Sequence, residues 1–206
     1  RRDQAAREGV VWVRGALDDP TALTALVTGA DAVIHIAGVV SADRAGFIAG
    51  NIEGTRAVVA ASERAGVARF VHVSSLAARE PDLSIYGWSK AAAETVVTAS
   101  GLDWTILRPA AVYGPGDLEM RDVFRAARLG IALLPPPGVM GAVAVDDLAR
   151  LLIVTSARGT PHAVYEVDDG TRWTHAEFAA AIGEAVGRRV MSIPLPRAMM
   201  MLGARI

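Results

Sequence analysis

Residues 69–110 read RFVHVSSLAAREPDLSIYGWSKAAAETVVTASGLDWTILRPA, and this stretch decides the fold. Its two ends, residues 69–75 and 103–110, are short apolar runs of strand length. Residues 85–101 between them have the apolar spacing of a helix and end at Gly101. Two strands joined by one helix form a βαβ unit, whose strands are parallel. The stretch therefore predicts a parallel sheet with a covering helix.

The upstream sequence repeats this alternation. Residues 10–13 (VVWV) and 31–38 (DAVIHIAG) predict strands, residues 20–30 predict a helix, and residues 51–66 predict a helix that stops at Gly66. Apolar strands that alternate with helices are typical of parallel sheets with both faces covered. We therefore predict an α/β fold, a Rossmann-like doubly wound parallel sheet, whose ligands bind beyond the carboxyl ends of the strands.

The regular alternation of predicted strands and helices ends after about residue 115. The remaining segments predict helices over 118–129, 145–157 and 174–187, and strands over 163–169 and 190–196. Thr174 and Glu177 have the spacing of a capping box at the start of the last helix. We predict a Rossmann domain over residues 1–115 and a smaller substrate-binding lobe over residues 116–206, the latter incomplete at its C-terminus.

The composition is that of a globular protein with a large core. Of its 206 residues, 52% are hydrophobic and 21% charged, and the net charge of −1 offers no basic field for nucleic acid. The absence of cysteine excludes disulfides and thiolate chemistry. The longest uncharged run, residues 129–145, has three prolines in its middle and is no membrane helix. We expect a cytoplasmic protein that acts on a small molecule, with a homodimer as its candidate assembly, no nucleic-acid partner and no membrane span.

Tyr86 and Lys90 stand four residues apart, so their side chains share one face of the predicted helix. A phenol beside an ammonium can transfer protons, because the positive charge favours the phenolate. A surface tyrosine beside a solvated lysine has this spacing too, and the surrounding sequence decides between the two. Ala37-Gly38, Ser74-Ser75 and Pro109-Ala110 all follow predicted strands at their carboxyl ends, where ligands of such sheets bind.

Seven short motifs stand in order along the chain. They are Gly15-Ala16-Leu17, His35-Ile36-Ala37-Gly38, Asn51-x-x-Gly54-Thr55, Val73-Ser74-Ser75, Tyr86-x-x-x-Lys90, Arg108-Pro109 with Val112-Tyr113-Gly114, and Val145-Asp146-Asp147-Leu148. In this order they resemble the extended short-chain dehydrogenase/reductase family, of the NAD(P)-dependent epimerase/dehydratase type. That family begins with a strand and a G-x-x-G-x-x-G turn that holds the pyrophosphate. No such turn precedes Arg1, and we expect it to lie upstream of the sequence given.

The resemblance implies a catalytic set. Tyr86 would move a proton on or off the substrate oxygen, and Lys90 would support Tyr86 and hydrogen-bond the nicotinamide ribose. Ser75 would orient the substrate carbonyl or hydroxyl, while Ser74 would point to the other face of the strand. Asn51 has two interpretations of equal weight, a helix N-cap or a residue that supports the cofactor and the lysine.

The resemblance also implies cofactor contacts from Arg1, Ala16, Leu17, Ala37, Gly38, Val73, Ser74, Tyr86, Lys90, Pro109 and Val112. Ala16 stands where the family has an aspartate that binds the adenine amino group, so we expect weaker or altered adenine contacts. Asp18 lies one position beyond that place and fits a turn better. Arg1 or Arg2 could bind a ribose 2′-phosphate, which favours NADP over NAD as the cofactor.

The substrate is expected to be a small, mostly apolar hydroxy or keto compound. Residues 141–144 (GAVA) offer no side-chain donor for a diphosphate, and residues 129–140 are nearly all apolar. The loop between Ser75 and Tyr86 is short. Oxidation, epimerisation and dehydration all remain open. The alternative is a catalytically silent nucleotide-binding assembly or regulatory protein, similar to the branch of the respiratory complex I accessory subunit.

No pair among the four histidines, His35, His72, His162 and His175, has metal-ligand spacing, so we predict no metal. His35 and His72 lie within predicted strands, where a buried histidine with a hydrogen-bond partner is the expected role.

Overall fold

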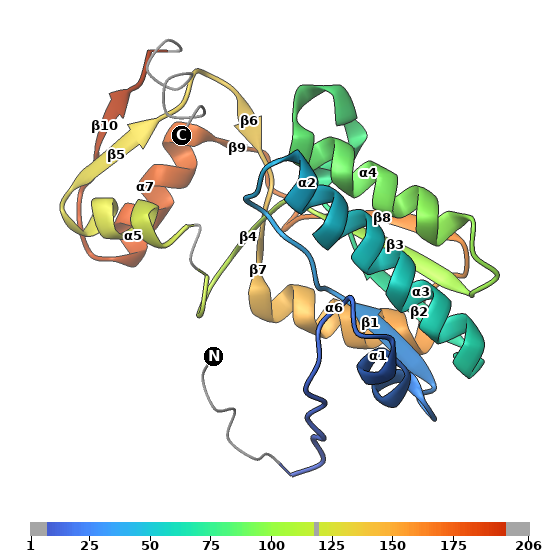
Figure 1. Ribbon diagram of the computed structural model, residues 1–206. Coiled ribbons are helices and arrows are strands. Elements are labelled where there is room, and N and C mark those ends of the chain that lie inside the picture. The colour runs from blue at the N-terminus through green and yellow to red at the C-terminus, as the bar shows by residue number, and fades with distance from the viewer. Residues whose placement is uncertain (1–7, 118–119, 197–206) are drawn as a thin grey trace. The chain divides into compact units, whose positions relative to one another are not determined.

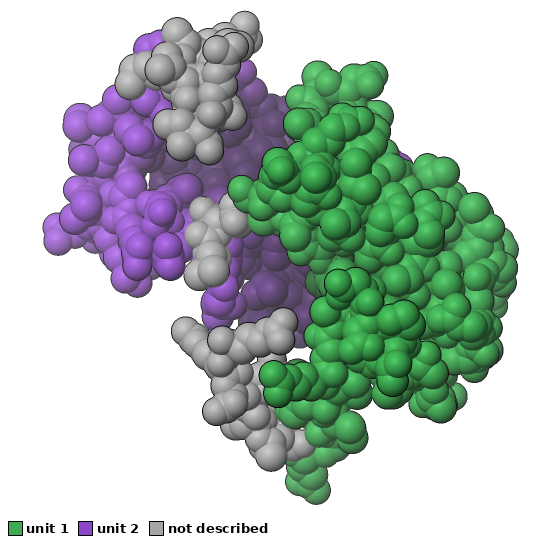
Figure 2. All heavy atoms as spheres, viewed as in Figure 1, with its two compact units in different colours: residues 1–107, 154–165 green, residues 108–153, 166–206 purple. Residues whose placement is uncertain are grey.

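The computed structural model describes residues 8–117 and 120–196, and the chain divides into two compact units (Figure 2). Unit 1 comprises residues 1–107 and 154–165, and unit 2 comprises residues 108–153 and 166–206. Neither unit is continuous in sequence, because the chain leaves unit 1 within a strand and returns to it within a helix.

Unit 1 contains the Rossmann-like part of the fold (Figure 1). Its elements are α1 (Pro20–Val27), β1 (Ala32–His35), α2 (Arg44–Phe47), the π-helix η1 (Ile48–Glu53), α3 (Gly54–Ala65), β2 (Arg69–Val73), the 3₁₀ turns η2 (Leu76–Arg79) and η3 (Pro81–Leu83), α4 (Ile85–Thr98), most of β3 (Trp104–Pro109), the end of α6 (Val145–Arg158) and the start of β8 (Ala163–Val167).

The sheet of unit 1 has the strand order β1-β2-β3-β8. β1 and β2 are parallel, with His35 opposite His72, and β2 and β3 are parallel, with Val73 opposite Leu107. The carboxyl ends of three successive strands therefore lie at one edge of the sheet. This arrangement confirms the α/β fold and the strands predicted over 31–38, 69–75 and 103–110.

Helices pack against both faces of this sheet. Phe70 and Ile106 are fully buried against α1, α3 and α4 in the main hydrophobic core. Arg69, the neighbour of Phe70, points to the opposite face, because successive strand residues alternate. Its guanidinium donates to the carbonyl oxygens of Thr155 and Gly159 at the C-terminal end of α6. Covering helices on both faces are what the apolar strands of the sequence predict.

The predicted strand over residues 10–13 is wrong, since these residues form no strand. Val11 is 86% exposed and Trp12 is 54% exposed, so neither packs in the core. Within the described residues no strand pairs with them, and without a partner an extended segment has no ladder of hydrogen bonds to hold it.

The predicted helix over residues 51–66 begins earlier than its pattern indicates. Asp43 caps α2 by accepting from the backbone amide of Gly46, and the helix continues through η1 into α3. Gly66 ends α3 in the left-handed conformation, as predicted. Asn51 lies within the π-helix, so its interpretation as an N-cap is wrong.

Unit 2 is built from short strands and two helices. Its elements are β4 (Ala111–Tyr113), α5 (Arg121–Arg128), β5 (Ile131–Leu134), β6 (Val139–Met140), β7 (Ala142–Ala144), β9 (Trp173–Thr174), α7 (His175–Ala185) and β10 (Met191–Pro194), with parts of β3, α6 and β8. The pairs β4-β7, β5-β10 and β6-β9 each form a small sheet. Phe178, Ile182, Ala127 and Ala142 form the buried core of this unit.

The predicted capping box is confirmed in unit 2. The Thr174 side chain accepts from the Glu177 backbone amide, and the Glu177 carboxylate accepts from the Thr174 backbone amide at 2.8 Å. The apolar stretch 129–144, for which the sequence analysis predicts no strand, folds into β5, β6 and β7 and buries Ala142 and Val143. Among the described residues, no helix is long and apolar enough to cross a membrane.

Candidate active site

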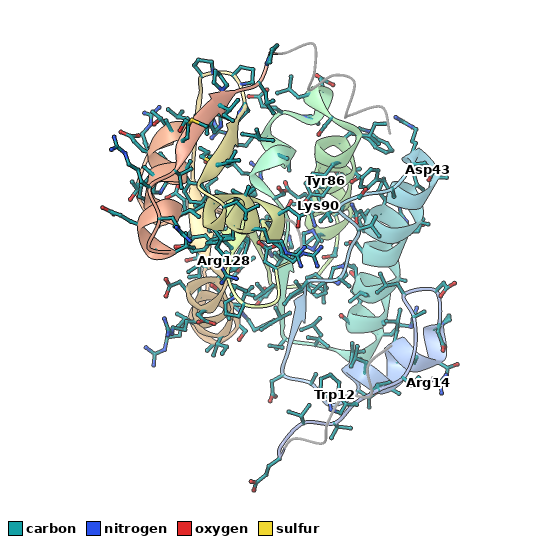
Figure 3. All side chains as sticks on the ribbon, turned by 90° about the vertical axis from the view of Figure 1, so that its left-hand side faces the viewer. Trp12, Arg14, Asp43, Tyr86, Lys90 and Arg128 are labelled. Atoms are coloured by element: carbon teal, nitrogen blue, oxygen red, sulfur yellow. The ribbon has the colours of Figure 1, made fainter. Side chains whose placement is uncertain are left out.

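Lys90 ties α4 to the carboxyl end of β2. Its side chain is only 6% exposed, and its Nζ donates to the carbonyl oxygen of Val73 at 2.8 Å (Figure 3). Burial lowers the pKa of Lys90 to about 8, against the opposing effect of the Glu94 carboxylate. Lys90 is also the only lysine in the 206 residues, in which every other cationic side chain besides histidine is arginine.

Tyr86 lies one turn before Lys90 on α4 (Figure 3). Its ring is half-buried and packs at a tilt against Phe47 of α2, with 6.0 Å between the ring centroids. The described residues form no hydrogen bond with the Tyr86 hydroxyl. A phenol anchored by its ring, with its oxygen unbonded by any described residue, is suited to bonding a substrate oxygen.

A glycine brings the turn after Ser75 next to the turn of Tyr86. A Cβ added to Gly87 would lie 2.6 Å from the carbonyl oxygen of Ala77, which is a clash. Only glycine permits this approach of α4 to η2, the 3₁₀ turn that Ser75 caps. Ser75 is half-buried, and its Oγ accepts from the Ala77 amide at 3.2 Å. The packing of η2 on α4 thus gathers Ser75 and Tyr86 at one edge of the sheet.

Asn51 is fully buried and bonds two other segments of unit 1. Its Oδ1 accepts from the Val39 amide at 2.7 Å, and its Nδ2 donates to the Val39 carbonyl at 3.0 Å. The same Nδ2 donates to Ser89 Oγ at 2.8 Å, and Ser89 Oγ donates to the Tyr86 carbonyl at 2.8 Å. Asn51 therefore connects the loop after β1 with the Tyr86 turn of α4. The sequence carries no signal for Ser89.

The loop after β1 approaches Asn51 closely at Gly38. A Cβ at Gly38 would lie 2.8 Å from Asn51 Oδ1, so the site admits no larger residue without a shift. Ala37 and Gly38 are both exposed at the carboxyl end of β1. Small exposed residues there leave the backbone open to a ligand.

His35 and His72 are buried core residues. Their rings stack with 5.3 Å between centroids, and His35 Nε2 lies 3.0 Å from Thr55 Oγ1. Burial and the charge of Lys90 lower the pKa of His35 to about 4, and burial, with the charges of Lys90 and His35, lowers the pKa of His72 well below its ordinary value. The rings are therefore neutral at neutral pH. His72 differs from the expectation of a satisfied histidine, since neither of its ring nitrogens has a partner among the described residues.

Ser74, the residue that follows β2, is buried, and its amide donates to the Leu107 carbonyl at 2.7 Å. Its Oγ has no partner within the described part of the chain. Ser74 and Ser75 therefore have distinct surroundings, as the sequence analysis expects, with Ser75 the more accessible of the two.

An apolar pocket of about 530 Å³ opens in unit 1 between the segment before α1 and the helices α2 to α3. Its lining residues are Leu17, Asp18, Pro20, Ala45, Ile48, Ala49, Glu53, Gly54 and Ala57. Leu17 packs on the start of α3, where a Cβ at Gly54 would lie 2.6 Å from its Cδ1. Asp18 occupies a turn, as expected, and also faces this pocket.

The remaining predicted cofactor residues are Pro109, Val112, Arg1 and Ala16. Pro109 and Val112 belong to unit 2, on β3 and β4. Arg1, like Arg2, lies outside the described residues. Ala16 is exposed in the segment before α1 and does not line the pocket. In the described ranges, no three His, Asp or Glu side chains are grouped so that they could hold a metal ion.

Comparison with known proteins identifies the family. The family model described as NAD(P)H-binding matches residues 1–132, and the chain belongs to this family. The ceramide reductase of Caulobacter vibrioides is 38% identical over 190 residues, which cover 89% of this chain and 60% of that protein. A dTDP-glucose 4,6-dehydratase of Streptomyces antibioticus is 28% identical over 206 residues, covering 86% of this chain and 62% of that protein.

Solved structures agree with this assignment. A double mutant of DesIV, a dTDP-glucose 4,6-dehydratase from Streptomyces venezuelae solved with NAD bound, matches with a TM-score of 0.75 at 25% identity. The match covers 89% of this chain and 66% of that one. MoeE5 in complex with UDP-glucose and NAD matches with a TM-score of 0.74 at 25% identity, over 89% of this chain and 71% of that one.

These findings confirm the predicted resemblance to NAD(P)-dependent epimerase/dehydratase-type enzymes and the Rossmann-like fold. The chain spans less than two thirds of the length of the two curated relatives described, 60% of one and 62% of the other.

Proposed function

We propose that this chain is the nucleotide-binding and catalytic part of an NAD(P)-dependent oxidoreductase that acts on a hydroxy or keto compound. The observation that carries the proposal is Lys90, the only lysine, buried at the carboxyl end of β2 one turn from Tyr86. A buried amine with a lowered pKa is costly to keep in a core, and such groups concentrate at functional sites.

The residues of unit 1 fit a nicotinamide dinucleotide. Lys90 Nζ has three hydrogens and uses one on Val73, so two remain for the hydroxyls of a ribose. Gly38 keeps the backbone after β1 accessible at the edge where ligands of parallel sheets bind. When bound, the nicotinamide supplies the hydride that reduces a carbonyl carbon, or accepts it in the reverse direction.

In the reduction, Tyr86 donates its phenolic proton to the substrate oxygen as the carbonyl becomes an alcohol. The positive charge of Lys90 stabilises the phenolate that remains, which solvent then reprotonates. Ser75 Oγ is the group we propose to orient the substrate oxygen. In oxidation the same proton returns from the alcohol to Tyr86.

The apolar pocket at Leu17 is the proposed site of the adenine base. Its walls are mostly apolar, as a base that stacks between side chains requires. Asp18 and Glu53 are the two charged residues that line it, and both are carboxylates, which favour an amino group over a phosphate. Asp18 thus offers an acceptor for the adenine amino group in place of the aspartate that Ala16 replaces.

We propose NADP over NAD as the cofactor by a slight margin, because of the basic residues Arg1 and Arg2. Pro109 and Val112 remain proposed contacts of the nicotinamide end. We also propose that the residues after about 115, apart from residues 154–165 of unit 1, belong to a substrate-binding lobe.

The substrate that we propose is mostly apolar. The sequence supports this, since residues 141–144 carry no side-chain donor for a diphosphate. The relative with 38% identity is a ceramide reductase, and a relative with 27% identity is a 3beta-hydroxysteroid dehydrogenase/isomerase from Caenorhabditis elegans; ceramides and steroids are both mostly apolar. The nucleotide-sugar enzymes described above are at most 28% identical, about as distant as the steroid enzyme and well below the identity of the ceramide reductase.

The test is oxidation of NADH and NADPH by the full-length protein with long-chain and bicyclic ketones, together with reduction of NAD and NADP with the corresponding alcohols, dTDP-glucose and UDP-glucose, because these sugars carry hydroxyls and no free carbonyl to accept a hydride. We expect turnover with an apolar ketone, and loss of turnover by about a hundredfold or more in Tyr86→Phe, with the nucleotide still bound. Turnover that survives Tyr86→Phe would refute the proposed mechanism. Tight nucleotide binding without hydride transfer to or from any of these compounds would favour the alternative, a silent nucleotide-binding assembly protein.

A further inference from the structure

A buried pair of polar side chains, Asn51 and Ser89, lies behind the proposed active site. Asn51 is 1% exposed and Ser89 is 0% exposed. Neither is predicted to touch substrate. Burying two polar side chains is unfavourable unless each is hydrogen-bonded, so their presence calls for a reason beyond the hydrophobic core.

The pair forms one chain of hydrogen bonds across three segments. Val39 is held by both its amide and its carbonyl on the Asn51 side chain, at 2.7 and 3.0 Å. Asn51 Nδ2 continues to Ser89 Oγ, and Ser89 Oγ continues to the Tyr86 carbonyl, each at 2.8 Å. Both polar atoms of the Asn51 side chain are therefore bonded within unit 1.

The residue at the centre of these hydrogen bonds, Asn51, lies in the π-helix η1. Asn51 lies within Ile48–Glu53, between the regular helices α2 and α3. A π-helical turn adds a residue to the regular repeat and changes the direction of the side chains around it, and such turns are frequent at functional sites. The local cost of this geometry is offset by bonds that a regular helix does not make.

We propose that Ser89 and Asn51 form a latch that holds the Gly38–Val39 loop against the Tyr86 turn of α4. Both are positioning residues, because they act through Val39 and Tyr86 rather than on substrate. The catalytic role first expected for Asn51 is replaced by this one. The inference rests on the proposed function, in which the loop after β1 contacts the nucleotide and Tyr86 transfers the proton.

When Ser89 loses its hydroxyl, we expect the Gly38–Val39 loop and the Tyr86 turn of α4 both to be held less rigidly. In Ser89→Ala we expect weaker nucleotide binding and a fall in kcat of about tenfold to a hundredfold, because a small misplacement of a reacting group has effects of this size. Ser89→Thr keeps the hydroxyl and should restore much of both. Water that reaches Lys90 should also move its pKa upward, toward the ordinary lysine value.

Ser62→Ala is the matched control. Ser62 is also 0% exposed and its Oγ also donates to a backbone carbonyl one turn earlier, that of Val58 at 2.8 Å. The control loses the same kind of helical bond away from the site. It should lower stability less than Ser89→Ala, which also loses the bond from Asn51, and should leave nucleotide binding, kcat and the Lys90 pKa unchanged.

The experiment measures three quantities for wild type, Ser89→Ala, Ser89→Thr, Ser62→Ala, Asn51→Ala and the double variant of Asn51 and Ser89. They are the Kd for NADPH, kcat, and the Lys90 pKa from the NMR signal of labelled lysine Cε that is absent in Lys90→Met. Sub-additive effects of Asn51→Ala and Ser89→Ala support the latch. Equal effects of Ser89→Ala and Ser62→Ala, or fully additive effects of the pair, overturn it.

The NMR measurement needs neither nucleotide nor substrate. If wild type binds no nucleotide, the proposed function fails, and the Lys90 pKa in Ser89→Ala still decides whether the latch exists. If wild type binds and turns over but Ser89→Ala matches wild type in all three quantities, the latch fails while the proposed function stands.

Discussion

Replacing Lys90 by methionine should stabilise the protein while removing its activity. Methionine has nearly the shape of lysine without its charge. The drop in the pKa of Lys90 from 10.5 to about 8 corresponds to a penalty of about 3 kcal/mol for the charged amine, at about 1.36 kcal/mol per tenfold change. The hydrogen bond to Val73 is lost in the variant and offsets about 1 kcal/mol of this. We expect Lys90→Met to be about 2 kcal/mol more stable near neutral pH.

The stability difference between wild type and Lys90→Met should change with pH, and its direction follows from the two pKa values of Lys90. Because the folded state has the lower pKa, about 8 against 10.5 in the unfolded chain, the unfolded chain binds more protons between these values. The penalty is fully present below about pH 8, and it disappears as the pH rises to 10.5. Wild type should therefore gain stability relative to Lys90→Met across this interval, and the difference between them should shrink.

Urea unfolding of both proteins, followed by circular dichroism across that interval, measures the difference. Arg64→Met removes an exposed cation on α3 and should change neither stability nor its pH dependence. A Lys90→Met variant that is less stable than wild type near neutral pH, or a difference that does not change with pH, would refute the reasoning. Direct titration of the Lys90 NMR signal checks the pKa itself.

Three further outcomes are expected from single changes. Gly87→Ala should lower stability by about 1–3 kcal/mol and reduce kcat, because its Cβ would lie 2.6 Å from the Ala77 carbonyl oxygen. The control Gly101→Ala, whose Cβ would have its nearest neighbour at 3.8 Å, should change neither quantity. Equal urea midpoints for the two variants would contradict this prediction. Asp18→Asn should weaken binding of NADPH but not of its deaminated hypoxanthine analogue, as titration calorimetry would show; an equal loss for both nucleotides would mean that Asp18 does not bind the amino group. Asp31→Asn, at the opposite end of β1, is the control and should change neither affinity. His72→Phe should leave the protein folded and at least as stable, because no described group bonds the ring nitrogens of His72. A loss of more than about 3 kcal/mol in the free energy of unfolding, measured by thermal unfolding, would show that these nitrogens are bonded in solution.

Much of the fold of unit 1 follows from local sequence. Apolar strands of limited length, helical spacing and a left-handed Gly66 are local properties, and they locate β1, β2, β3, α3 and α4 within a few residues. Residues 10–13 have the same local composition as a strand, yet they form none. Strand formation depends on a neighbouring backbone that supplies hydrogen bonds, and no window of sequence contains that information.

For the candidate site, the sequence alone determined which groups could carry the chemistry: Tyr86 and Lys90 at helical spacing, with Ser75 at a strand end. Spacing along one helix is a local matter, so it could be predicted. Only the tertiary structure decided that Lys90 is buried on Val73, that Gly87 must be a glycine, and that Ser89 joins Asn51 to the Tyr86 turn. Each of these facts joins residues distant in sequence, and contacts of that kind arise only when the packed elements bring them within bonding distance.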